Sequence, residues 1–498
     1  MRVCPSKRRR MTEMRRGLEM VNAIQHEGRT IEPLTKDDRK DVASLKAYAV
    51  KNGFDIVYRV PVDITGAPHG FAHPTNYALE EGKVLGFDGS SLTGYQAINE
   101  SDMKTEFLPT GAFVDTSHGT PKLYVPARIH DPVSGQPYSK DPINIALRAA
   151  AFAKQRGYTA NFGPEPEFFL FDSVSAEVLP NGSSYLVESR EGAWVKGKMG
   201  LGYQIAFKKG YAPLPPFDTL EEVREDIMRA LMFNGVTVET GHHEVGTAGQ
   251  GEIDMRYADV VTQAHQLLMF KHLVKNIARK HGLAATFLPK VIVGDNGSGM
   301  HVHQSLWRGE ENVFAGSGYG GLSEVGLHYI GGILKHGPAL CALTNPTTIS
   351  YKRIVPHCEA PTNLVYSARN RSAAIRIPQY EPGNKKAVRP EVRFPDPMAS
   401  GYIAFSAMLL AGMDGIEEKI DPGKPFDGNV WENADGLPQL PGSLDEALDA
   451  LERDHEFLTR VGVFTDDFLQ AWIALKREEA REVKTLPHPA EIARHFGS

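Results

Sequence analysis

The sequence predicts a protein of mixed helix and strand content, divided into a small β-rich domain and a larger second domain. Residues 38–135 have the pattern of short strands separated by turns, with strands at 56–60 and 123–125 and a turn at 86–91. Beyond residue 138, runs with helical spacing alternate with strand-like runs. The chain has 498 residues, of which 41% are hydrophobic, so it is long enough for more than one domain.

We expect three regions along the chain. Residues 1–37 are predicted to be a flexible extension, 38–138 the small domain and 139–498 the larger one. The extension is rich in Arg and Lys, but no long apolar stretch follows, so a secretory signal is not predicted. A solvated extension is favoured over an arm that binds nucleic acid or membrane.

Composition narrows the possible partners. A formal net charge of −6 argues against a nucleic-acid binder that depends on an overall basic field. The sequence lacks the ~18 uninterrupted apolar residues of a membrane span, so no membrane partner is expected. Cys4, Cys341 and Cys358 are scattered without CxxC spacing, which predicts free thiols in a reducing cytoplasm.

The first helices of the larger domain are predicted from their start and stop signals. A helix is expected at 143–155, and it leads into a strand at 162–169. A second helix is expected at 219–234, where Thr219 and Glu222 have the spacing of a capping box.

Three further elements follow along the chain. A strand is expected at 236–239. The next helix is predicted to end before Gly282 and to carry one apolar stripe, formed by Leu267, Phe270, Val274 and Ile277. The apolar run at 402–413 is too short to span a membrane and predicts a buried helix.

Three short segments have charged or polar groups on one strand face and apolar groups on the other. Because side chains alternate along a strand, the residues that share the polar face are Glu165 and Glu167, then His301, His303 and Ser305, and then Arg389, Glu391 and Arg393. Crowded carboxylates raise one another's pKa, and burial adds to the cost. Divalent cations and a phosphorylated substrate are the natural compensation.

Two more glutamates, Glu244 and Glu252, flank a glycine-rich stretch at 246–251. Carboxylate oxygens with one imidazole suit magnesium or manganese, whereas zinc is expected to take more His or Cys ligands. The charge of the glutamates is comparable to that of two divalent cations, which favours a paired-metal site. The glutamates in this argument are Glu165, Glu167, Glu244, Glu252 and Glu391.

Two glycine-rich segments differ in how strongly they indicate a nucleotide-binding loop. Residues 294–299 have the pattern of a flexible nucleotide loop and lead directly into His301. Residues 192–198 match most of a P-loop, but Met199 stands where Ser or Thr is required and no apolar strand precedes it.

Arginines are dense between residues 353 and 393, which suggests an anionic substrate or a triphosphate. These arginines are Arg353, Arg369, Arg371, Arg376, Arg389 and Arg393.

Several long motifs together resemble type I bacterial glutamine synthetase. They are residues 87–91, 99–103, 163–168, 294–303, 345–348, 369–372 and 393–396, and the match runs from about residue 50 to the end. The resemblance implies an α+β protein with an N-terminal β-grasp domain and a C-terminal catalytic domain built on a curved antiparallel sheet flanked by helices. It also implies a homo-oligomer, a dodecamer with active sites between subunits.

The activity implied by the resemblance is that of a glutamate–ammonia ligase. Such an enzyme joins ammonia to the γ-carboxylate of L-glutamate through a γ-glutamyl phosphate intermediate, giving L-glutamine, ADP and phosphate. ATP would be the co-substrate, with two Mg²⁺ or Mn²⁺ ions in each active site.

The resemblance also implies roles for individual residues. The metal nearer glutamate would be held by Glu167, Glu244 and Glu252, and the metal nearer ATP by Glu165, His301 and Glu391. The nucleotide site would be lined by Tyr211, Glu239, His303, Ser305, Arg371, Arg376, Lys386 and Arg389. Glutamate would be bound by Glu167, Asn296, Gly297, Arg353, Glu359 and Arg393. Ammonium would bind at Asp88 and Ser91.

Three of these residues are expected to act on the reacting groups. Asp88 would accept a proton from ammonium, and Glu359 would shield the acyl phosphate from water. Arg371 would neutralise charge on the phosphates.

One position departs from the family pattern. Trp431 stands where members controlled by adenylylation have a tyrosine. Tryptophan has no hydroxyl group to modify, so this regulation is predicted to be absent at that position. The unusual pair His357 and Cys358 lies beside Glu359, and no role is assigned to it.

Three alternatives remain open at this stage. The nearest is a relative that joins glutamate to a larger amine, such as a polyamine or ethanolamine; Asp88, Ser91 and Glu359 favour ammonia instead. A non-catalytic structural or regulatory protein could have lost its metal carboxylates, yet every expected ligand is present. A two-metal hydrolase would not explain the arginine-rich stretch as well.

Overall fold

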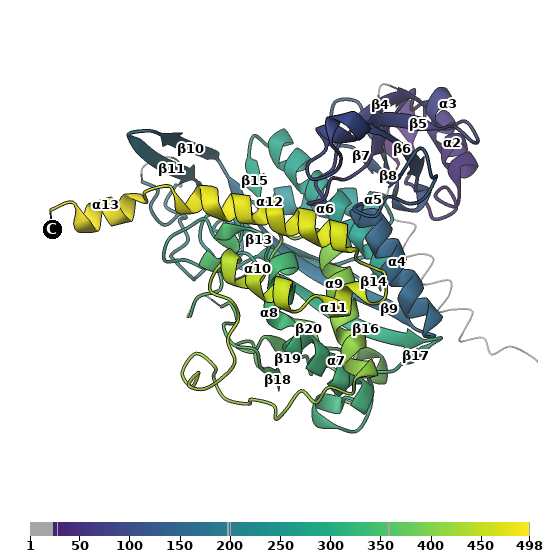
Figure 1. Cartoon of the computed structure of the whole chain (residues 1–498). Coiled ribbons are helices and arrows are strands. Elements are labelled where there is room, and N and C mark those ends of the chain that lie inside the picture. Colours follow the sequence, from purple (N-terminus) through teal and green to yellow (C-terminus); the bar gives the residue numbers. More distant parts are fainter. Residues whose placement is uncertain (1–22, 27, 197–198, 200, 357–358, 498) are drawn as a thin grey trace, which may run out of the picture.

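The computed structural model describes residues 23–26, 28–196, 199, 201–356 and 359–497. Figure 1 shows the small domain at one corner of the molecule and the sheet of the larger domain near the centre. The predicted mixed architecture is therefore confirmed, with a curved sheet flanked by helices.

The small domain is a mixed sheet with two helices beside it. Its strands are β3 (Ile56–Val60), β4 (Phe71–Pro74), β5 (Leu85–Asp88), β6 (Asp102–Phe107), β7 (Phe113–Asp115) and β8 (Lys122–His130). The strand order is β4-β3-β8-β6-β5, with β7 also paired to β8, and β3 runs parallel to β8. The helices are α2 (Val42–Lys51) and α3 (Thr75–Ala78).

The core of this domain begins before residue 38. Strands β1 (Ile24–His26) and β2 (Arg29–Ile31) form a hairpin, and both Ile31 and Leu34 are buried with Leu45, Val57 and Leu123. Most of the predicted extension, residues 1–22, lies outside the described residues.

The sheet of the larger domain is built around the long strand β9 (Thr159–Phe171). Its order is β12-β13-β9-β16-β20-β19-β18. The other strands of this path are β12 (Val238–His243), β13 (Gln250–Met255), β16 (Met300–Arg308), β18 (Tyr366–Ala368), β19 (Ile375–Ile377) and β20 (Glu391–Val392). Short strands pair beside it, namely β14 (Ala258–Asp259), β15 (Ala284–Thr286) and β17 (Glu311–Asn312). The pairing is antiparallel except between β18 and β19, which run parallel.

Helices flank this sheet, some packed against its strands and others against those helices, and together they bury one large apolar core. They are α4 (Pro142–Gln155), α5 (Glu221–Phe233), α6 (Val260–Lys280), α7 (Glu324–Lys335), α8 (Gly337–Thr344), α9 (Gly401–Glu417), α10 (Leu444–Arg453), α11 (Glu456–Thr459) and α12 (Asp466–Lys484). Helix α9 is buried from Gly401 to Gly415 and packs against α4, α6 and α7, so the buried helix predicted at 402–413 is confirmed.

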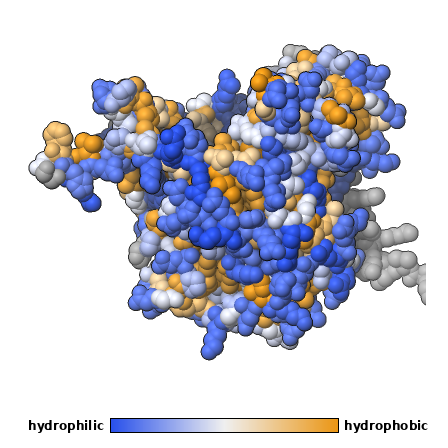
Figure 2. Space-filling view, in the orientation of Figure 1, coloured by the Kyte–Doolittle hydropathy of each residue, from blue (hydrophilic) through white to orange (hydrophobic). Residues whose placement is uncertain are grey.

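Two elements project from the body of the molecule. The hairpin of β10 (Ser173–Leu179) and β11 (Gly182–Glu188) extends on one side, and the terminal helix α13 (Pro489–His495) extends beyond α12 (Figure 1). Both carry exposed apolar side chains, including Val178, Leu186 and Ile492. The space-filling view shows hydrophobic residues at the tip of the C-terminal projection (Figure 2).

Most predicted elements are confirmed, with differences at some of their ends. The strand at 56–60 and the helices that end at Gln155 and before Gly282 are present. Residues 86–88 were predicted as part of a turn but belong to β5, and the turn itself is the short helix η1 (Gly89–Ser91).

The predicted capping box at Thr219 is wrong. Helix α5 begins at Glu221 and its N-cap residue, Leu220, makes no side-chain cap. The Thr219 hydroxyl instead donates to the buried carboxylate of Glu191 over 2.8 Å, because this buried acceptor needs a donor. The following strand starts at Val238 rather than at residue 236.

Two expectations about composition are tested in part. Cys341 is buried as a free thiol, whereas Cys4 and Cys358 lie outside the described residues. Within the described ranges, none of the helices is both long and apolar enough to cross a membrane.

Candidate active site

The predicted polar strand faces meet in one row across the central sheet. Glu252 lies opposite Glu167, Glu165 opposite His301, and Glu391 opposite both His303 and Arg376. At the edge of the row, His242 lies opposite Glu252. The apolar residues of the same strands, such as Phe168, Val302 and Val392, are fully buried in the core. The alternation that the sequence predicted is therefore confirmed.

One half of the row is a carboxylate and imidazole cluster backed by arginines. Nε2 of His303 lies 2.7 Å from Glu165, and Nδ1 of His301 lies 3.5 Å from Glu165 and 3.9 Å from Glu391. Burial opposes ionisation of Glu165, yet the charge and hydrogen bonds of the two histidines hold its pKa well below the usual range.

Glu391 has no exposed surface and lies between two guanidinium groups. Arg376 donates to one carboxylate oxygen and Arg393 to the other. Although burial acts in the opposite direction, Arg393 and then His303 lower the pKa of Glu391. The carboxylate is therefore held ionised in a place from which water is excluded.

The other half of the row crowds several carboxylates together. Burial and then Glu244 raise the pKa of Glu167 well above its usual range. Burial followed by Glu165 does the same to the pKa of Glu252. His242 is the imidazole closest to this half, at 3.5 Å from Glu244 and 3.3 Å from Glu252. Such a site favours bound cations, which would let these acids ionise together.

The side chains fit divalent cations. Three sets of potential ligand atoms lie within 4.8 Å of one another: Glu165, Glu252 and His301; Glu165, His303 and Glu391; and His242, Glu244 and Glu252. Burial and then Arg393 lower the pKa of His301 to about 4, and its Nε2 atom is buried without a partner among the described residues. A neutral ring with a free nitrogen is what a cation requires.

These sets differ in membership from the two triads that the resemblance implied. They add His242 and His303, and Glu167 belongs to none of them. Glu167 instead accepts a hydrogen bond from the Gln250 amide over 2.8 Å. The assignment of ligands to two separate metals therefore stays a prediction.

The residues expected to bind glutamate gather beside the row. Asn296 donates to Glu359 over 2.8 Å, and its own Oδ1 atom is buried without a partner in the described part of the chain. The guanidinium group of Arg353 is buried and donates to the carbonyls of residues 393, 394 and 395. Glu359 has a φ of 54°, a left-handed conformation that is uncommon for a residue with a side chain.

Several expected nucleotide residues contact the row, at more than one place along it. Arg389 donates to Nδ1 of His303 over 3.1 Å, and the ring of Tyr211 meets that of His242 edge to face. Ser305 accepts a hydrogen bond from the Trp307 indole, and Arg371 lies 3.4 Å from the Tyr380 hydroxyl. Glu239 and Lys386 are exposed.

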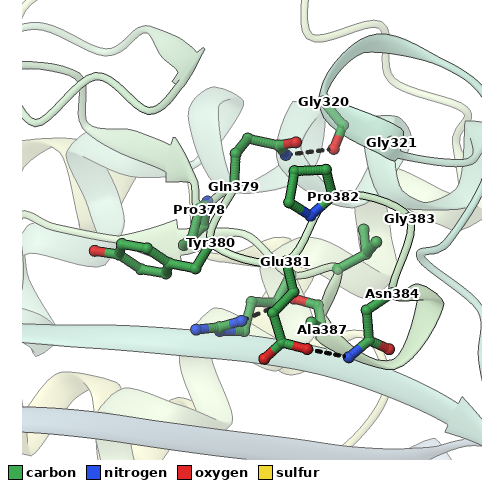
Figure 3. A pocket seen from close by; sticks show the side chains of 12 residues that line it. Gly320, Gly321, Pro378, Gln379, Tyr380, Glu381, Pro382, Gly383, Asn384 and Ala387 are labelled. Atoms are coloured by element: carbon green, nitrogen blue, oxygen red, sulfur yellow. Dashed lines mark hydrogen bonds between the residues drawn. The ribbon is translucent and has the colours of Figure 1, made fainter.

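A pocket of about 120 Å³ adjoins Arg389 (Figure 3). Asn384 donates to Glu381 over 2.6 Å across it, and the Gln379 amide donates to the Gly320 carbonyl over 2.8 Å. Asn384 also accepts from the backbone N–H of Lys386, so it fixes the turn that carries this lysine.

Asp88 and Ser91 lie elsewhere in the chain, at the end of β5 in the small domain. Asp88 accepts hydrogen bonds from the Ser90 hydroxyl and the Ser91 hydroxyl, both over 2.6 Å, and these lower its pKa. In Figure 1, β5 lies well apart from β16 and β20. Within one described chain, no hydrogen bond or ion pair joins Asp88 to the row.

Sequence reasoning missed three side chains of this site. His242 and Gln250 were given no role. Asp254 shares a strand face with Glu252, which the period of two could have revealed. Burial and then the charge of Glu165 raise the pKa of Asp254 to about 8.

Comparison with known proteins agrees with this geometry. The family model described as "Glutamine synthetase, catalytic domain" matches residues 139–495. Glutamine synthetase from Aquifex aeolicus is 52% identical over 413 residues, covering 82% of this chain and 88% of the relative. The enzyme of the same name from Neisseria gonorrhoeae is 46% identical over 449 residues, covering 87% of this chain and 95% of the relative.

Solved structures share the fold. Plasmodium falciparum glutamine synthetase superposes with a TM-score of 0.83 at 28% identity, covering 91% of this chain and 98% of that one. A complex of GmaS with ADP superposes with a TM-score of 0.78 at 27% identity, covering 91% of this chain and 99% of that one.

Proposed function

The chain belongs to the glutamine synthetase family, and on this basis we propose that it joins ammonia to the γ-carboxylate of L-glutamate at the expense of ATP, giving L-glutamine, ADP and phosphate. The observation that carries the proposal is the row of carboxylates, imidazoles and arginines on one face of the sheet. Asn296 and Arg353 lie beside this row, so an amino acid and a triphosphate could meet there.

The chemistry explains why such a row is useful. A carboxylate resists attack by ammonia because oxide is a very poor leaving group, so ATP must first convert the γ-carboxylate into an acyl phosphate. Phosphoryl transfer depends mainly on positioning and on neutralising the phosphate charge. Arg371 would face the phosphates and Arg393 the substrate, which places positive charge where negative charge develops.

Divalent cations fit the site, and the family uses ATP with a divalent metal. We propose two Mg²⁺ or Mn²⁺ ions, one held by Glu167, Glu244 and Glu252 and one held by Glu165, His301 and Glu391. When bound, they would draw charge away from the transferred phosphoryl group. Glu359 would then exclude water from the acyl phosphate.

Ammonium must lose a proton before it attacks, and Asp88 is our candidate acceptor. Its separation from the row supports an oligomer in which the small domain of one subunit faces the sheet of the next. The exposed apolar side chains of the two projecting elements support further contacts between subunits, and a dodecamer is our proposal for the assembly.

An omission assay tests the function. We expect ADP release that falls to background when ATP, glutamate, ammonium or the divalent cation is left out in turn. Release that persists without ammonium and glutamate would indicate an ATPase instead. Organic amines tested at equal concentration should support much slower release, and activity with those amines alone would exclude ammonia as the substrate.

A further inference from the structure

Two loops that carry residues of the candidate active site are joined by hydrogen bonds. The carboxylate loop, residues 244–249, runs from β12 to β13 and contains Glu244. The glycine loop, residues 294–299, leads into β16 and contains Asn296 and Gly297. The first loop belongs to the cation site and the second to the glutamate site.

Gln250 connects the two loops through both ends of its amide. Its Oε1 atom accepts from the backbone N–H of Gly246 over 2.7 Å. Its Nε2 atom donates to Glu167 over 2.8 Å and to the carbonyl of Gly297 over 3.1 Å. The side chain is 1% exposed, so solvent does not compete for these bonds. One amide therefore fixes a carboxylate of the row and the main chain of both loops.

Asp295 belongs to the glycine loop and makes a second connection, to the carboxylate loop. One carboxylate oxygen accepts from the backbone N–H of Thr247 over 2.7 Å, and the other accepts from that of Lys208 over 2.9 Å. Asp295 has no exposed surface. An amide in its place would turn an NH₂ group toward one of these N–H donors, so either the buried N–H of Thr247 or the part-buried N–H of Lys208 would lose its acceptor.

We infer that Asp295 and Gln250 are positioning residues that couple cation binding on the carboxylate loop to glutamate binding on the glycine loop. This inference rests on the proposed function, because it takes the two ligands from it. Each ligand orders one loop, and the buried bonds transmit that order to the other loop. The second ligand then loses less conformational entropy when it binds, so each ligand raises the affinity of the other site for its own ligand.

The test measures Mn²⁺ binding directly by electron paramagnetic resonance, with and without L-glutamate, on the full chain. The ratio of the two Mn²⁺ dissociation constants is the coupling factor, expected in the wild type at about 5-fold or more. In Asp295→Asn this factor should fall to near one, and the KM for glutamate should rise about tenfold while the Mn²⁺ affinity without glutamate changes less.

Asp141→Asn is the matched control. Asp141 is also fully buried, and each of its carboxylate oxygens likewise accepts one backbone N–H, from Ile129 over 2.9 Å and from Ile143 over 3.0 Å. It lies at the start of α4. This variant makes the same substitution outside the two loops and should keep the wild-type coupling factor.

The outcomes separate the two proposals. The inference would be overturned if Asp295→Asn kept the wild-type coupling factor. It would also be overturned if glutamate did not change the Mn²⁺ affinity of the wild type. A wild type that couples the ligands but releases no ADP with ammonium would leave the coupling intact and refute the ligase activity. If Asp295→Asn does not fold, Gln250→Met carries the same test, since it removes every hydrogen bond of the amide at similar side-chain volume.

Discussion

Glu391 interacts with both guanidinium groups and imidazoles of the row. Its carboxylate is fully buried and accepts from both Arg376 and Arg393, while His301 lies 3.9 Å away. The residue thus serves two purposes, because it anchors two guanidinium groups and offers charge to a cation.

Replacing Glu391 with Gln should therefore impair both stability and activity. Two buried arginines would lose their shared counter-charge, so we expect a loss of about 3–5 kcal/mol in unfolding free energy. ADP release should fall by at least about a hundredfold. Urea unfolding and the steady-state assay measure these effects.

Asp172→Asn is a suitable control for this substitution. Asp172 also pairs with an arginine, Arg190, but both side chains are partly exposed. Exposed pairs contribute about 0–1 kcal/mol, so this variant should remain close to wild type. Equal losses in the two variants would contradict the role assigned to Glu391.

The resemblance to the family places Trp431 where we expect a tyrosine in members regulated by adenylylation. Its indole N–H donates to the carbonyl of Ala360 over 3.3 Å, so it contacts the segment that carries Glu359. Because it lacks a hydroxyl group, we expect no nucleotidylated peptide spanning residues 425–435 by mass spectrometry of protein purified under nitrogen-rich and nitrogen-poor growth. Detection of such a peptide would show that another side chain accepts the nucleotide.

Residue pairs in one strand could be predicted from sequence, whereas contacts between loops could not. The period of two is enough to place Glu165 beside Glu167 and His301 beside His303. The link from Gln250 to Gly297 depends on how two distant loops pack, and no local pattern encodes it. Asn and Gln are also common on surfaces, so their presence in a sequence carries little information about function.

At the scale of elements, helices α7 and α9 pack through glycines. A Cβ atom on Gly415 would lie 2.2 Å from the carbonyl oxygen of His328 and 2.6 Å from the backbone nitrogen of Gly332. These are backbone atoms of the facing helix, so they cannot move aside as a flexible side chain would. Periodicity predicted that α9 is buried, but not that its backbone approaches α7 so closely.

Gly415→Ala should therefore destabilise the protein although alanine favours helices. The clash should cost about 3 kcal/mol, against a gain of about 1 kcal/mol in helix propensity, for a net loss of about 2 kcal/mol. Thermal unfolding monitored by circular dichroism measures the change. Gly119→Ala provides a control, because a Cβ there meets no described atom within 4 Å. A stabilised Gly415→Ala would mean that the helices can separate without cost.

The start of α4 makes stability depend on pH. Burial raises the pKa of Asp141 from its usual 3.8 to about 7, against the hydrogen bonds from Ile129 and Ile143. Between these two pH values the folded protein keeps a proton that the unfolded chain has released. This contribution therefore is fully present at and below about pH 4, decreases as pH rises to about 7 and then stays constant.

Asp141→Asn cannot titrate, so it isolates this contribution. The unfolding free energy of the wild type minus that of the variant should fall between pH 4 and 7 by an amount on the order of 4 kcal/mol. Urea unfolding at a series of pH values measures the difference. A difference that does not vary with pH would mean that Asp141 is ionised throughout.

At the scale of the whole molecule, the residues that we propose for catalysis and binding are divided between two separated places. The row, the glutamate residues and the nucleotide residues lie on the larger domain, whereas Asp88 and Ser91 lie on the small one. Sequence motifs could predict each group, because each is a short local pattern. They could not predict the separation, because that depends on how the two domains pack and on which copy of the chain completes the site.

This separation leads to a test with two inactive variants. Asp88→Asn would lose the proton acceptor and Glu391→Gln the metal carboxylate, so each homo-oligomer should be nearly inactive. If sites form between subunits, a mixed oligomer contains some sites in which the small domain comes from the Glu391→Gln chain and the sheet from the Asp88→Asn chain. Random assembly at equal amounts makes about a quarter of the sites fully wild type.

The two variants are co-expressed with different affinity tags, and the mixed oligomers are isolated by two successive purifications. ADP release should recover to roughly a quarter of the wild-type value if sites are shared as proposed. If each chain instead completed its own site, every site would keep one defect and activity would remain at the level of the parent variants. Co-expression of wild type carrying both tags controls for any effect of purification, because the arrangement of subunits is then the same and every site is intact.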